Sequence, residues 1–105
     1  MTAFAAAISA IFRDRNMAQD ALYRAGGSGE PIPVRVIKRA PDRFASFGEG
    51  RFVAEAVLID VQITDVAQLE RGDTIEIGSE VFEVRSDPVR DSERMVWAAE
   101  ARALP

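Results

Sequence analysis

The fold is decided by residues 68–84, which read QLERGDTIEIGSEVFEV. Ile75 and Ile77 are two positions apart, so they share one face of a short strand. Gly78 and Ser79 then supply a two-residue loop, because glycine can take the positive φ that such a hairpin turn demands. The stretch therefore predicts a tight β-hairpin.

The returning strand, residues 81–84, places Phe82 and Val84 on a common face. Before the hairpin, Arg71-Gly72-Asp73 predicts an entry turn, with glycine where the chain must bend. The same tripeptide matches an adhesion motif, but the turn explains it fully. We therefore assign it no binding role.

The rest of the chain predicts a mainly β protein with an N-terminal helix. Residues 66–69 predict a single helical turn, in which Leu69 would plug the end of the core. Two-residue alternation predicts further strands at residues 20–24, 32–39, 52–63 and 94–102. Short connections make these strands antiparallel, so we expect a small antiparallel β-barrel or sandwich. At 105 residues the chain is expected to form one domain, 1–105, with the barrel or sandwich at 20–105.

The N-terminal helix is predicted at residues 1–16. Its large apolar side chains, Phe4, Ile8, Ile11 and Phe12, follow a helical spacing and form one stripe. Two interpretations remain open: the stripe packs on the domain's own sheet, or it docks on a neighbouring subunit. Phe4, Ile8 and Phe12 are therefore candidate interaction residues.

Two connections are predicted to be flexible. Residues 25–31 are rich in glycine, but a proline-led strand follows them, so they do not fit a phosphate-binding loop. Residues 42–51 form the other loop, which contains candidate interaction residues of the types enriched at interfaces. The candidates are Arg43, Phe44, Phe47 and Arg51, and either phenylalanine could instead cap the core.

The core should contain the single tryptophan. Trp97 and Phe82 fall on the inward faces of their predicted strands, and we expect both to be buried. The predicted strand 52–63 adds one strongly apolar face, which suits a central member of the sheet. Residues 87–92, with two turn signals, are predicted to form a loop.

Composition leaves little room for catalysis. The chain has no cysteine and no histidine, which removes the thiolate nucleophile, the usual acid–base group and the commonest metal ligands. Asp60 with Glu76 is a formal carboxylate pair, but 17 acidic residues make chance pairs common. We expect no catalytic residue, no cofactor and no metal, and hence no enzyme.

The net charge and the hydropathy of the chain argue against nucleic-acid and membrane partners. A net charge of −4 argues against a surface that grips nucleic acid. No apolar run approaches the roughly 20 residues of a membrane span, so we expect no membrane partner. Residues 4–12 are apolar, but no Lys or Arg precedes them as in a signal peptide. We therefore expect an intracellular protein.

The last third of the chain resembles the head–tail joining proteins, also called head-completion or stopper proteins, of long-tailed phages. The resemblance rests on a Gly-Asp-Thr, Ile, Gly turn followed by an aromatic residue and valine. Here these are Arg71-Gly72-Asp73-Thr74-Ile75-Glu76-Ile77-Gly78 and then Phe82-Glu83-Val84. The resemblance continues through residues 87–91 to the strand around Trp97, and it covers the rest of the chain only in outline.

The resemblance implies a structural virion protein at the neck, cytoplasmic before assembly. Such proteins form a homo-oligomeric ring, usually a hexamer, between the portal or adaptor protein of the head and the tail-terminator protein. They retain DNA in the filled head, and the DNA itself is no fixed partner: it only passes through the lumen of the ring. The particle could be a phage, a prophage or a gene-transfer agent. The alternatives are a tail-terminator or tail-completion ring protein, and a stand-alone small β-barrel that binds a partner.

Overall fold

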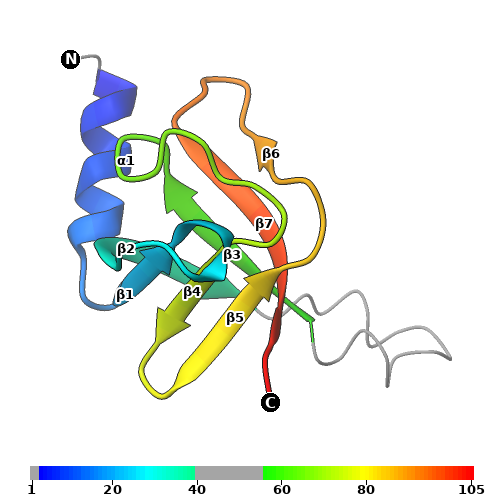
Figure 1. Ribbon diagram of the computed structural model, residues 1–105. Coiled ribbons are helices and arrows are strands. Elements are labelled where there is room, and N and C mark those ends of the chain that lie inside the picture. Colours follow the sequence, from blue (N-terminus) through cyan, green and yellow to red (C-terminus); the bar gives the residue numbers. More distant parts are fainter. Residues whose placement is uncertain (1–2, 40–55) are drawn as a thin grey trace, which may run out of the picture.

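The computed structural model describes residues 3–39 and 56–105. Six antiparallel strands in the order β3-β2-β1-β4-β5-β7 form a barrel, and pairing of β3 with β7 closes it (Figure 1). The predicted mainly β fold with an N-terminal helix is confirmed, in its barrel form. The elements are α1 (Ala3–Arg13), β1 (Gln19–Arg24), η1 (Ala25–Gly27), β2 (Ile32–Arg39), β3 (Ala56–Gln62), β4 (Thr74–Ile77), β5 (Glu80–Val84), β6 (Val89–Arg90) and β7 (Val96–Ala103).

The β4–β5 hairpin forms as predicted. Ile77 pairs with Glu80, which leaves Gly78 and Ser79 as the two-residue loop. Gly78 has φ 61°, a conformation that glycine adopts without the steric cost that a Cβ would bring. Ile75 and Ile77 are both buried, so the alternation placed the correct face inward.

The barrel interior also contains the two aromatic residues that the sequence placed there. Trp97 is 6% exposed and Phe82 is 3% exposed, and both belong to the interior cluster. Leu69 belongs to it as well, at 1% exposed, as expected for a plug. The indole Nε1 of Trp97 donates a hydrogen bond to the carbonyl of Val66, 2.9 Å away, so its polar atom is satisfied.

The closing strand pair fits large side chains against small ones. Ile59 of β3 lies opposite Ala99 of β7, and Val61 lies opposite Trp97. The apolar face predicted for residues 52–63 is therefore the inner face of β3. The described strand is shorter, Ala56–Gln62, and residues 52–55 of the prediction lie outside the described residues.

The predicted helical turn at residues 66–69 is wrong. The chain turns earlier, because Asp65 and Val66 both donate their backbone N–H to the carbonyl of Gln62. The Asp65 carboxylate accepts from the backbone N–H of Arg35 and does not cap a helix. The Val66 carbonyl accepts a hydrogen bond from the indole N–H of Trp97. Long-range hydrogen bonds thus replace the local ones that a helical turn needs.

Three other boundaries also differ from the predictions. The helix occupies Ala3–Arg13, and residues 14–17 form a turn instead of continuing to 16. The connection predicted as flexible begins with η1, and Gly29 donates to the carbonyl of Ala25. The predicted loop 87–92 contains β6, which pairs with β7 beyond the part of β7 that β5 covers.

Candidate interaction surfaces

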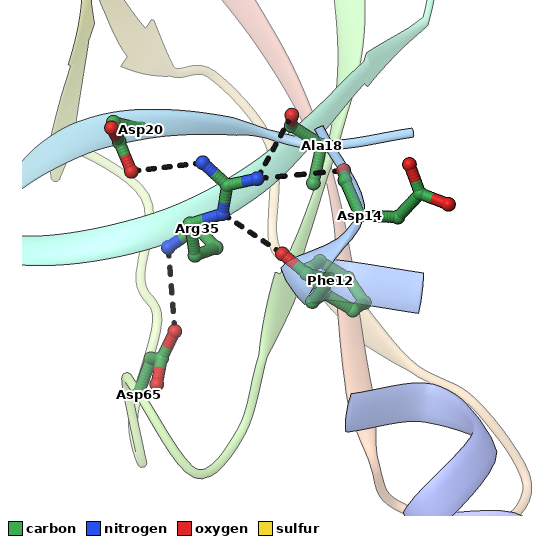
Figure 2. A network of polar contacts seen from close by, with 6 residues as sticks. All are labelled: Phe12, Asp14, Ala18, Asp20, Arg35 and Asp65. Atoms are coloured by element: carbon green, nitrogen blue, oxygen red, sulfur yellow. Dashed lines mark hydrogen bonds and ion pairs between the residues drawn. The ribbon is translucent and has the colours of Figure 1, made fainter. Parts of the chain in front are cut away.

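Helix α1 lies on one flank of the barrel, beside β2, and its C-terminal end is held by Arg35 (Figures 1 and 2). Val34 and Val36 of β2 point into the barrel, so Arg35 between them points outward. An outward arginine on a strand usually meets only solvent. Here it meets the end of the helix and the turn that follows.

The Arg35 guanidinium binds three backbone carbonyls at and just after the C-terminal end of the helix; that of Phe12 belongs to the last turn, where carbonyls lack partners within the helix. Its Nε lies 2.9 Å from the carbonyl oxygen of Phe12, and one terminal nitrogen lies 3.1 Å from that of Ala18 and 3.4 Å from that of Asp14. Its other terminal nitrogen lies 2.9 Å from a carboxylate oxygen of Asp20. A cation at this position also suits the negative end of the helix dipole. Arg35 therefore fixes where α1 leaves the barrel.

The apolar stripe of α1 is divided between two environments. Phe12 is 2% exposed but lies outside the interior cluster, so it packs between the helix and the outside of the barrel. Phe4 and Ile11 are 43% and 38% exposed, and Ile8 is partly buried. The subunit thus covers Phe12 by itself, while Phe4, Ile8 and Ile11 form a ridge, the α1 ridge, that it leaves largely uncovered.

The second group of predicted interaction residues lies outside the described residues. Arg43, Phe44, Phe47 and Arg51 all belong to the segment 40–55. Whether they form an interface or cap the core stays a prediction, as does the flexibility of residues 42–51.

Asp73 carries a polar network that the sequence did not reveal. Its side chain is buried and accepts three hydrogen bonds: from the hydroxyl of Tyr23 at 2.7 Å, and from the backbone N–H groups of Gly26 and Glu70 at 2.8 Å each. This network joins β1, η1 and the entry turn of the hairpin. A carboxylate used in this way is not displayed for adhesion, which agrees with reading Arg71-Gly72-Asp73 as a turn.

The same network alters the acidity of the only tyrosine. Burial of Tyr23 disfavours the phenolate, and the hydrogen bond to Asp73 and the negative charges of Asp73 and Glu70 add to the effect. Together they raise the pKa of Tyr23 well above its ordinary value of about 10. Tyr23 is therefore a neutral hydrogen-bond donor and a structural element of the fold.

A hollow of about 440 Å³ lies on the flank of the barrel that carries β6, between the loop at residues 68–71 and the loop at 87–88. We call it the Trp97 hollow. Its apolar lining residues are Leu69, Pro88 and Trp97. Its charged ones are Glu70, Arg71 and Asp87. A second hollow adjoins it, shares Pro88 and Trp97, and includes Val89, which is 67% exposed.

The carboxylates do not assemble into a reactive site. Asp60 of β3 pairs with Arg39, and Glu76 of β4 pairs with Arg24, each at 2.8 Å. Across residues 3–39 and 56–105, no group of three or more potential metal ligands comes together. In the same part of the chain, no helix is long and apolar enough to cross a membrane. What this part of the chain offers is a closed barrel with exposed apolar side chains on α1.

These features describe a closed β-barrel with a largely uncovered helix, and comparison with protein families shows to which family of proteins it belongs. The family described as phage head–tail attachment protein matches residues 1–101. Neither the curated proteins nor the solved structures that were searched gave a match.

The match covers nearly the whole chain, so the protein belongs to the phage head–tail attachment family. The family is one of structural phage proteins. Membership gives the protein a head–tail joining role and a place in the virion where head and tail meet. It also implies contacts with components of the head and the tail.

Proposed function

We propose that copies of this protein assemble as a ring at the neck, with the head's portal or adaptor protein on one side and the tail-terminator protein on the other. The ring holds DNA in the filled head until the tail is attached, and DNA then leaves through its lumen. Six copies are the expected number. The same role would serve in a phage, a prophage or a gene-transfer agent.

The observation that carries this proposal is the family match over residues 1–101. It favours a joining protein over a tail terminator and over a stand-alone binding module. The α1 ridge adds support, because exposed apolar side chains that follow one line on a helix are typical of a surface that another protein covers.

A joining assay tests the proposal directly. DNA-filled heads that lack this protein should neither retain their DNA stably nor accept tails, and the purified protein should restore both. Negative-stain images of the restored heads should show an added ring at the portal vertex. Restoration without a ring, or no restoration by folded protein, would contradict the proposal.

Passage of DNA through a lumen requires that the protein not grip it. The chain carries 13 basic and 17 acidic residues. In addition, six of the described cations already form ion pairs with carboxylates of the same subunit: Arg24, Arg35, Lys38, Arg39, Arg71 and Arg85. These ion pairs offset part of the positive charge that could release counterions from phosphates, and a ring repeats the acidic excess of each copy around a narrow channel.

We therefore expect the soluble protein to bind duplex DNA no better than a neutral control protein at physiological salt. A gel-shift titration at two salt concentrations measures this. Micromolar binding that weakens with salt would place the chain among nucleic-acid binders and contradict free passage.

A further inference from the structure

We draw no further inference here: the strongest candidate, the apolar surface patch of the α1 ridge formed by Phe4, Ile8 and Ile11 on the flank of the barrel, carries none because nothing in the structure shows what covers it.

Discussion

Replacing Arg35 by alanine should release α1 while leaving the barrel folded. The change removes the guanidinium that binds the carbonyls of Phe12, Asp14 and Ala18 and the carboxylate of Asp20. The barrel loses little, because Arg35 points outward and the neighbouring valines keep their place in the interior. The helix loses this polar anchor and keeps the packing of Phe12.

The size of the effect follows from the geometry. Two of the carbonyl contacts, 2.9 and 3.1 Å, are well formed, and a hydrogen bond to a charged group contributes about 1.5–3 kcal/mol when sheltered. The contact to Asp14, at 3.4 Å, and the pair with Asp20, whose side chain is 93% exposed, add little. Because the Arg35 side chain is itself 26% exposed, we expect a total of roughly 2 kcal/mol for holding the helix.

Amide hydrogen exchange measures this locally. In Arg35→Ala, protection over residues 4–13 should fall by about 30-fold, since ~1.4 kcal/mol corresponds to a factor of ten. Protection in the barrel strands should stay near wild type. Arg35→Lys should behave much like alanine, because one ammonium cannot reproduce the planar fork of donors.

Arg39→Ala is the matched control. Arg39 also points outward from β2, but it makes one exposed ion pair, with Asp60. The loss of this ion pair should change the stability of neither α1 nor the barrel by more than a few tenths of a kcal/mol. Unchanged protection of α1 in Arg35→Ala, or an equal loss in Arg39→Ala, would refute the view that Arg35 anchors the helix.

Two further predictions concern the raised pKa of Tyr23 and the positive φ of Arg94. The raised pKa of Tyr23 means that the folded state favours the protonated phenol, so the free energy of unfolding should be steady below about pH 10 and fall as the pH rises further. Absorbance of the phenolate, which only this tyrosine can form, should appear together with unfolding; phenolate near pH 10 in a folded protein would contradict it. Arg94 has φ 55°, which is costly for a residue with a Cβ, so Arg94→Gly should raise the free energy of unfolding by about 0.5–1 kcal/mol after the entropy of glycine is subtracted. A lower melting temperature in that variant would show that the Arg94 side chain makes a compensating contact.

Much of the barrel could be predicted because its signals are local. Alternation put Ile75 with Ile77 and Phe82 with Val84 on common faces, which are the inward faces of β4 and β5, and a single glycine located the hairpin loop. Trp97 could be placed in the core because few positions suit so large an apolar side chain. Closure into a barrel, in contrast, depends on the pairing of β3 with β7, which are far apart in sequence.

The features missed depend on contacts between distant residues. Arg35 looks like any outward strand arginine until the helix end is placed beside it. β6 has only two residues and exists because β7 extends past β5. Asp73 left one usable signal: the chain has a single tyrosine, and the hydroxyl of a buried tyrosine requires a partner. That requirement points to a buried acceptor without saying which of 17 carboxylates supplies it.

The closed barrel limits how copies of the protein can meet in the proposed ring. Closure pairs the six long strands of residues 3–39 and 56–105 on both sides, so these strands offer no free edge on which a second chain could extend the sheet. The short strand β6 does have an outer edge, but Pro88 precedes it and Asp91 turns the chain directly after it, accepting from the N–H groups of Met95 and Val96. Contacts between copies are then left to surfaces outside the sheet. The α1 ridge is such a surface, and Arg35 and Phe12 attach its helix to the outside of the barrel, so a change in the position of α1 need not disturb the barrel core.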